Sequence, residues 1–217
     1  HYRSHSFPTR RSSDLGLAQS ESSESFTGIE EIIVTARKKE EPLQETPVTI
    51  TALTDTKIQK LYATDLKDLG MSVPNLLINT NASGSFTNSA AVFMRGIGNS
   101  DIDSTIDPPI GIFLDGVYVP RSSNSNLDLF DVEQVEVLRG PQGTLFGRNT
   151  TAGAIVVRSK RPTGEFGAKA RLTMGDYGRR DLRVAVEAPL SDTVNAKISV
   201  LQQKSDGFYK ARYQTHP

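Results

Sequence analysis

Hydrophobic and polar positions alternate in the C-terminal part of the chain. Three segments, 166–174, 182–188 and 194–200, place apolar or small side chains at every second position, with mostly charged or polar side chains between them. A period of two is the pattern of a β-strand with one apolar and one polar face. The separators, 175–178 and 189–192, contain residues that favour turns. Such segments are typical of a transmembrane β-barrel with its apolar face toward lipid, although an amphipathic hairpin of a soluble sandwich has the same pattern.

Between residues 42 and 162 the pattern changes to short strand-like runs separated by polar loops. One stretch, 55–70, instead spaces Ile58 and three leucines as a helix does, and it ends at Gly70, a residue type that favours helix termination. The dipeptide Asp115-Gly116 between two apolar runs predicts a β-hairpin. The predicted strands are 46–53, 73–78, 91–98, 110–119, 132–140 and 152–162. This combination predicts an α+β globule built on a small mixed β-sheet with short helices.

Composition limits the class of protein. The chain has 217 residues, 36% of them hydrophobic, with a mean hydropathy of −0.36 and a formal net charge of zero. These values suit one or two folded domains and give no basic footprint for nucleic acid. No apolar run reaches the roughly 20 residues that a membrane-spanning helix needs. The absence of cysteine excludes disulfides, thiolate metal sites and cysteine nucleophiles.

The sequence lacks the residue patterns of a catalytic or metal site. His216 is the only histidine beyond the first residues, which excludes histidine-based catalysis. Asp101, Asp103 and Asp107 have the offsets of a calcium-binding loop. However, Ile106 occupies the position that requires glycine. We therefore predict a protein that is not an enzyme and that needs no metal or cofactor.

The first 15 residues look foreign to the protein. His5–Leu15 back-translate to a nucleotide sequence that resembles a sequencing adapter, so residues 1–15 are excluded from functional interpretation. Gly16 and Ala18 have the spacing of a signal-peptide cleavage site, which points to export. We therefore expect residues 16–29 to combine a signal-peptide remnant with a flexible tether rich in serine and glutamate.

Residues 30–41 contain a short apolar run in an unusual setting. Ile32–Val34 lies between the serine-rich tether and the charged residues 38–41. Because it lacks the flanks of a core strand, we predict an exposed β-forming segment outside the folded domain. The alternative is that Ile32–Thr35 is the first strand of the globule, and the two arrangements can belong to different states.

A glycine-rich run carries the most specific signal. Arg139–Gly153, RGPQGTLFGRNTTAG, lacks the spacing and the lysine of a phosphate-binding loop. It resembles instead a stretch of the TonB-dependent outer-membrane receptors. Other stretches that resemble this family, in the same order, are EEIIVTARK, PVTITAL, VPNLLI, FMRGIG and PPIGIFLDGVYVPR. The resemblance runs from about Glu30 to the end of the chain. It implies a barrel of about 22 strands whose lumen holds an N-terminal plug. This chain would supply the plug, residues 42–162, and the first antiparallel strands of a truncated barrel, residues 163–217.

The resemblance also implies roles for individual residues. Segment 30–41 resembles the TonB box, which adds a strand to the periplasmic domain of the partner protein TonB. The residues implied in that contact are Glu30, Glu31, Ile32, Ile33, Val34, Thr35 and Ala36. Arg95 and Arg139 match plug arginines that pair with barrel-wall glutamates, which would lie beyond Pro217. The loops that would face the ligand are Ser83–Asn88, Asn99–Asp103 and Arg121–Asn124, with Asn99, Asp101, Asp103, Arg121 and Asn124 as candidate contacts.

The resemblance predicts an energy-coupled importer in the outer membrane of a Gram-negative bacterium. Its ligand would be a scarce nutrient such as a ferric siderophore, cobalamin or a glycan. Its partners would be TonB, with the inner-membrane energy-transducing complex, and membrane lipid, and no nucleic acid. The alternative is a soluble periplasmic binding or interaction module whose last strands close on themselves. For this chain we expect residues 164–217 to stay unpaired or to aggregate, because their apolar face requires lipid.

Overall fold

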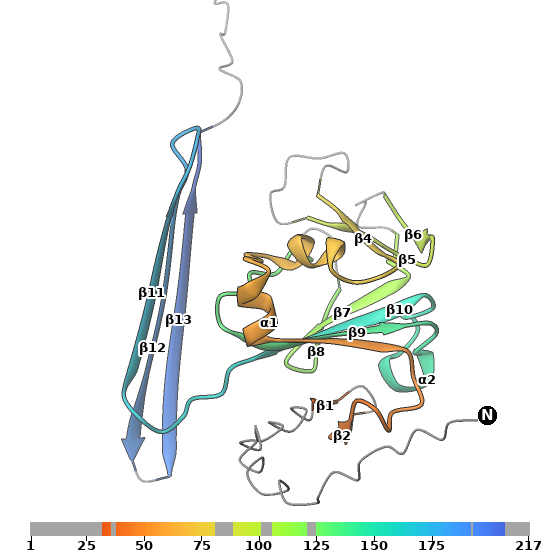
Figure 1. Cartoon of the computed structure of the whole chain (residues 1–217), viewed down its shortest axis with the longest axis horizontal. Helices are drawn as coiled ribbons and strands as arrows, with labels where there is room; N and C mark the ends of the chain where they lie inside the picture. Colours follow the sequence, from red (N-terminus) through yellow and green to blue (C-terminus); the bar gives the residue numbers. More distant parts are fainter. Residues whose placement is uncertain are drawn as a thin grey trace, which may run out of the picture. The chain divides into compact units, whose positions relative to one another are not determined.

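A five-stranded mixed sheet forms the centre of the structure (Figure 1), a computed structural model that describes residues 32–35, 38–80, 89–100, 106–120, 125–191 and 193–206. In spatial order its strands are β3 (Ile50–Thr54), β9 (Val132–Arg139), β10 (Gly153–Ser159), β7 (Ile110–Leu114) and β8 (Val117–Val119). Neighbouring strands pair antiparallel, except that β10 and β7 run parallel. The small mixed sheet predicted from the sequence is therefore confirmed.

The predicted hairpin joins β7 and β8. Asp115 and Gly116 have φ angles of 49° and 83°, so both central residues of the turn are in the left-handed region. That conformation is the one a type I′ turn requires, and glycine adopts it without strain. The Asp115 carboxylate also accepts hydrogen bonds from Ser159 N at 2.8 Å and from Ser159 Oγ at 2.7 Å, which attach the turn to the end of β10.

The continuous helix predicted over 55–70 is wrong. The structure has a short helix α1 (Asp55–Lys60) and a separate 3₁₀ helix η1 (Leu66–Met71). Tyr62 lies between them with a φ angle of 53°, which an α-helix cannot accommodate. Asp65 then starts the second element with a reciprocal capping box in which Asp68 takes part. Local capping and one left-handed residue therefore outweigh the helical spacing of the apolar side chains.

One face of the central sheet carries the main hydrophobic core. The elements packed there are α1, η1 and a small second sheet of β4 (Leu76–Asn79), β5 (Ala91–Met94) and β6 (Ile97–Gly98). The fully buried side chains of this core include Leu53, Leu66, Leu69, Met94, Val135, Val137, Ile155 and Val157. A one-turn helix, α2 (Gly143–Phe146), follows β9.

The opposite face of the central sheet is also covered. Two short strands, β1 (Ile33–Val34) and β2 (Glu41–Pro42), pair antiparallel with each other, and Val34 joins a second hydrophobic cluster on this face. As a result, Gln134 and Glu136 of β9 are buried. In the sequence they alternate with valines, a pattern that would place them on the solvent-facing side of an amphipathic strand. The cover comes from residues about one hundred positions earlier in the chain.

The C-terminal strands pair with one another. β11 (Gly167–Met174), β12 (Arg180–Ser191) and β13 (Val194–Lys204) form a three-stranded antiparallel sheet, so the expectation of unpaired strands is wrong. Along β11 the apolar positions are exposed and Lys169 and Arg171 are partly buried, which confirms the predicted alternation. Leu172, Ile198 and Val200 expose 60%, 69% and 59% of their surface. In the described part of the chain these strands form an open sheet with two edges and an uncovered apolar face.

Candidate partner-binding segment and ligand face

The segment Ile32–Thr35 is docked on the central sheet. Ile33 pairs with Pro42 and Val34 with Glu41, and Leu43 N donates to Ile32 O at 2.9 Å. Val34 is fully buried, whereas Ile33 exposes 49% of its surface. In this structure, then, the segment is a strand of the folded domain. This finding corrects the expectation of an exposed segment separate from the globule and matches the alternative, a first strand.

Two side chains of β9 hold the docked segment. Glu136 Oε1 accepts hydrogen bonds from Thr35 N at 2.8 Å and from Thr35 Oγ1 at 3.0 Å. Gln134 Nε2 donates to Ile33 O at 3.0 Å and to Glu136 Oε1 at 3.3 Å. Glu136 is fully buried, and this burial raises its pKa, against the opposing effects of the Thr35 hydrogen bonds and the charge of Arg158. The sequence reasoning missed both residues, because only the covering strand turns the polar side of β9 into an interior face.

Three members of the predicted partner-binding segment, Glu30, Glu31 and Ala36, lie outside the described residues. The contacts above therefore concern Ile32, Ile33, Val34 and Thr35 alone.

The two predicted plug arginines lie close together. Arg139 Nη2 donates to Thr51 Oγ1 at 2.9 Å, and Arg139 Nη1 donates to Pro74 O at 3.3 Å. The side chain of Arg95 is exposed, and its Nη1 lies 3.6 Å from the position that a Cβ would take at Gly140, the residue after Arg139. Within the described part of the chain, neither guanidinium has a carboxylate within salt-bridge distance.

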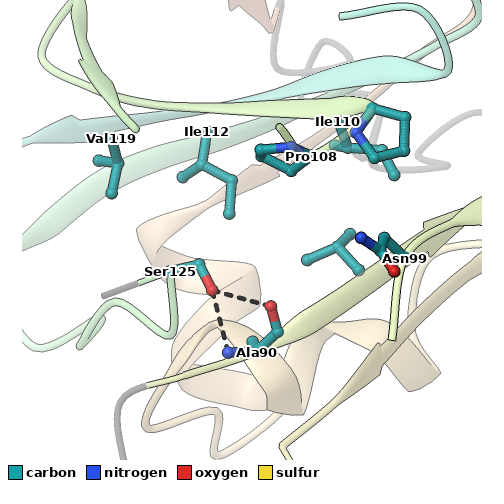
Figure 2. A pocket seen from close by; sticks show the side chains of 9 residues that line it. Ala90, Asn99, Pro108, Ile110, Ile112, Val119 and Ser125 are labelled. Carbon is teal, nitrogen blue, oxygen red and sulfur yellow. Dashed lines mark hydrogen bonds between the residues drawn. The ribbon is translucent and has the colours of Figure 1, made fainter. Parts of the chain in front are cut away.

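Described residues next to all three predicted ligand-facing loops lie around one small pocket. Ser89 and Ala90 follow the first loop region, Ser125 directly follows the third, and Ala90 and Ser125 are hydrogen-bonded (Figure 2). Ala90 N donates to Ser125 Oγ at 3.0 Å, and Ser125 Oγ donates to Ala90 O at 2.9 Å. Asn99, the first residue of the second loop region, and Pro108, which lies beyond its end, line the same small pocket. The loop ends therefore converge on one side of β5 and β7.

The pocket at these loop ends is too small for a nutrient ligand. Its walls are mainly apolar, and they include Val92, Ile110, Ile112 and Val119. Figure 2 shows Ile110, Ile112 and Val119 along the same side of the pocket as Pro108, across from Ser125 and Ala90. The cavity volume is about 10 Å³, close to the lower limit for a single water molecule. Of the five candidate contacts, Asn99 lines the pocket, and Asp101, Asp103, Arg121 and Asn124 lie outside the described residues.

Ion pairs connect the C-terminal strands to the loop before β9. Arg183 of β12 is fully buried, and its Nε donates to Asp128 Oδ2 at 2.8 Å. Lys197 Nζ of β13 lies 2.6 Å from Asp131 Oδ1, and Ser199 Oγ donates to Asp131 Oδ2 at 2.6 Å. Sequence reasoning missed these contacts, although the alternation does place Arg183, Lys197 and Ser199 on the polar face of their strands.

Neither a membrane-spanning helix nor a metal-binding cluster is found among the described residues. No helix there is long and apolar enough to cross a membrane. No group of three or more histidine, cysteine, aspartate or glutamate side chains in that part of the chain could hold a metal ion.

Comparison with known proteins places this geometry in a family. The model of the TonB-dependent Receptor Plug Domain matches residues 42–154, which is more than half of the chain. The chain belongs to this family. The plug domain so matched includes β3 to β9, both Arg95 and Arg139, and the ends of the three loops.

Individual relatives agree with the family match. The catecholate siderophore receptor Fiu of Escherichia coli strain K12 is 30% identical over 165 residues, which cover 76% of this chain and 20% of Fiu. The vitamin B12 transporter BtuB of Vibrio vulnificus strain CMCP6 is 26% identical over 177 residues, which cover 82% of this chain and 28% of BtuB. The chain therefore spans about a fifth of Fiu and little more than a quarter of BtuB.

A solved structure supports the same fold. The crystal structure of the ferric-catecholate import receptor Fiu from E. coli K12, in its open form, matches with a TM-score of 0.58 at 30% identity, over 76% of this chain and 22% of Fiu. The resemblance to TonB-dependent receptors that the sequence indicated is confirmed. In this plug-domain chain, β1 precedes the matched region and β11 to β13 follow it.

Proposed function

We propose that the protein to which this plug domain belongs is an energy-coupled outer-membrane receptor that imports a scarce nutrient, such as a ferric siderophore, cobalamin or a glycan. The observation that carries this proposal is the order of parts along one chain. A short strand-forming segment comes first, a TonB-dependent receptor plug domain follows, and amphipathic strands come last. The relatives named above are receptors and a transporter, and binding and passage require no covalent chemistry from the plug.

The segment Glu30–Ala36 is the proposed contact with the periplasmic domain of TonB. An extended segment can join the edge of a partner's sheet through main-chain hydrogen bonds, with alternate side chains setting the register. Ile33 and Val34 already have strand geometry, and their side chains point to opposite sides. The segment cannot serve the partner and the plug sheet at once, so partner binding requires it to leave Glu136 and Gln134.

The C-terminal strands support a place in the outer membrane. Leu172, Ile198 and Val200 form an exposed apolar face that lipid would cover, and Lys169 and Arg171 lie on the other face. The alternative, a soluble periplasmic module whose last strands close on themselves, would bury that face. The three loops that converge near Ser125 and Ala90 would then lie on the side of the plug that meets the ligand.

A cysteine cross-link tests the partner contact. The chain has no cysteine, so Ile33→Cys places its single thiol in the proposed contact. We expect the complete receptor with Ile33→Cys to form a disulfide with a cysteine scanned through the periplasmic domain of TonB, at alternate positions of one edge strand. Met71→Cys is the matched control, because Met71 is 98% exposed and lies outside the segment. Equal cross-linking at both positions, or none at Ile33, would contradict the proposal.

The two arginines give a second test, because the structure separates their roles. Arg139→Ala removes hydrogen bonds to Thr51 and Pro74 inside the plug, whereas no hydrogen bond of the Arg95 side chain is seen in the described part of the chain. If barrel glutamates pair with both arginines, removing either arginine leaves a glutamate carboxylate without a partner in a partly dry interface. This costs about 3 kcal/mol of stability in the complete receptor.

We therefore expect Arg95→Ala to leave the thermal stability of the 217-residue chain unchanged but to lower the melting temperature and increase the passive leakage of the complete receptor. Arg139→Ala should destabilise both proteins. An Arg95→Ala receptor with wild-type stability and leakage would rule out the proposed pairing for Arg95.

A further inference from the structure

A carboxylate lies in the middle of a buried apolar sheet face. Glu136 has a register partner on each neighbouring strand, and the register continues across the central sheet. The residues in line with it are Ala52 on β3, Val156 on β10, Phe113 on β7 and Tyr118 on β8. Glu136 is fully buried among them, under the strand that contains Val34. Burying an ionised carboxylate is costly unless its oxygens are hydrogen-bonded. A position that served packing alone would favour an apolar side chain.

Only half of this carboxylate is used by the docked strand. Oε1 accepts all three hydrogen bonds, two from Thr35 and one from Gln134. Oε2 is buried and has no hydrogen-bond partner in the described part of the chain. On the central sheet the docked segment is thus held at one oxygen, at the Gln134 contact with Ile33 O, and by the side chain of Val34, in addition to its pairing with β2.

We propose that Glu136 is a reversible latch for the segment Ile32–Thr35: its carboxyl group holds Thr35 while the strand is docked, and hydration of its ionised form stabilises the sheet face once the strand has left. This inference rests on the proposed function, because it describes how the partner-binding segment is kept on the plug and released. Undocking exposes Val34 and its apolar neighbours to water, which is unfavourable. Hydration of the buried carboxylate offsets part of that cost, which a leucine at this position could not do.

The latch makes docking dependent on pH. Burial raises the pKa of Glu136 above its ordinary value of 4.5 in the docked state, whereas the undocked, hydrated carboxyl returns toward that value. The docked state therefore binds more protons than the undocked state. Docking is strongest below pH 4.5, weakens as the pH rises through the raised pKa, and is constant above it.

Few other charged groups face Glu136. Arg158 of β10 is the charged neighbour on the sheet, and it lies 3.9 Å from Glu40 of the covering segment. Lys39 and Glu41 of the same segment form a second pair at 3.8 Å. Strand β3 contributes no charged side chain, since its residues are Ile50–Thr54. All these groups remain in a Glu136→Gln variant, so a comparison of the two chains isolates the carboxyl of Glu136.

A nitroxide spin label on Ile33→Cys reports docking directly. Ile33 is half-exposed, so the label points away from the core, and its mobility separates docked from undocked chains. The sample is the 217-residue chain in detergent micelles, titrated between about pH 4 and pH 8 around the ordinary carboxyl value. We expect the ratio of docked to undocked segments to fall several-fold as the pH rises. In Glu136→Gln, which keeps one acceptor oxygen, the ratio should not change with pH.

Two further variants complete the design. Glu133→Gln is the matched control, because Glu133 is an exposed glutamate on the same strand, and its profile should follow the unsubstituted chain. Thr35→Val keeps the β-branched shape but removes one hydroxyl donor to Glu136, and it should lower the docked-to-undocked ratio about tenfold at neutral pH.

Specific outcomes would overturn the latch. They are a flat profile in the unsubstituted chain, a slope that survives in Glu136→Gln, docking that strengthens with rising pH, or a label that is immobile at every pH. The measurement contains no TonB, so its failure differs from that of the proposed function. A sloping profile without cross-linking at Ile33 would remove the partner assignment alone, and a flat profile with intact cross-linking would remove the latch alone.

Discussion

Energised uptake is expected to fall to the level of cells that lack TonB when Ile33 is replaced by proline in the complete receptor, whereas Ile33→Val should be nearly silent. Proline removes a main-chain N–H donor and restricts φ, so a ladder of hydrogen bonds with a partner strand cannot form at that residue. Valine keeps the extended geometry and most of the apolar surface. Uptake of the nutrient that the wild-type receptor imports, measured in living cells with and without TonB, gives the result.

The structure makes Ile33 a cleaner position for this test than Val34. The Ile33 side chain is half-exposed, while Val34 is fully buried in the second hydrophobic cluster, so Val34→Pro would also remove core packing. Ligand binding at the outer face should survive Ile33→Pro, because the loop ends near Ser125 and Ala90 lie at other elements. If Ile33→Pro instead unfolds the plug or abolishes ligand binding, the segment is only a structural strand. Full uptake by the proline variant would equally exclude the coupling role.

Gly153→Val should unfold the plug more than any surface change. A Cβ at Gly153 would collide with Met94 Sδ and with the carbonyl oxygen of Leu138, and both residues are fully buried. A backbone oxygen inside a sheet cannot move aside, and overpacking of this kind costs about 1–3 kcal/mol or more. Valine favours strands, so a loss of stability would come from the collision and not from propensity.

We expect the melting temperature to fall by roughly 5 °C or more. Circular dichroism of the 217-residue chain in micelles measures this change. Gly143→Ala is the matched control. Nothing lies within 4 Å of a Cβ at Gly143, and alanine favours the helix α2 in which it lies. If the Gly153→Val chain has the same melting temperature as the Gly143→Ala chain, the prediction is wrong. That result would show that β10 and Met94 can move apart without loss of stability.

Features set by neighbouring residues were predictable from the sequence. The turn at Asp115 and Gly116 needs two residues with positive φ, and that dipeptide adopts them readily. The alternation along β11 to β13 follows from the two sides of a strand, whatever the strands pair with. The family resemblance rested on the run 139–153 in the same way, because its order of glycines and polar residues is local.

Local patterns failed where a second local signal competed with them. The apolar spacing over 55–70 predicts one helix, yet the left-handed Tyr62 and the capping box at Asp65 divide it into α1 and η1. The helical spacing and the helix-breaking residues lie within a few residues of each other in the sequence. Which of them prevails depends on their relative free energies, and the sequence pattern does not show these.

Only the tertiary structure decided that both sides of β9 are interior. The sequence determined a strand with Val135 and Val137 alternating with Gln134 and Glu136, and that pattern alone indicates one buried and one hydrated face. Burial of both faces depends on Thr35 and its neighbours, which lie 101 positions from Glu136 along the chain. Period-two alternation records the side of a strand on which a residue lies, and not what covers that side, because the covering contact is formed by chain collapse between distant segments.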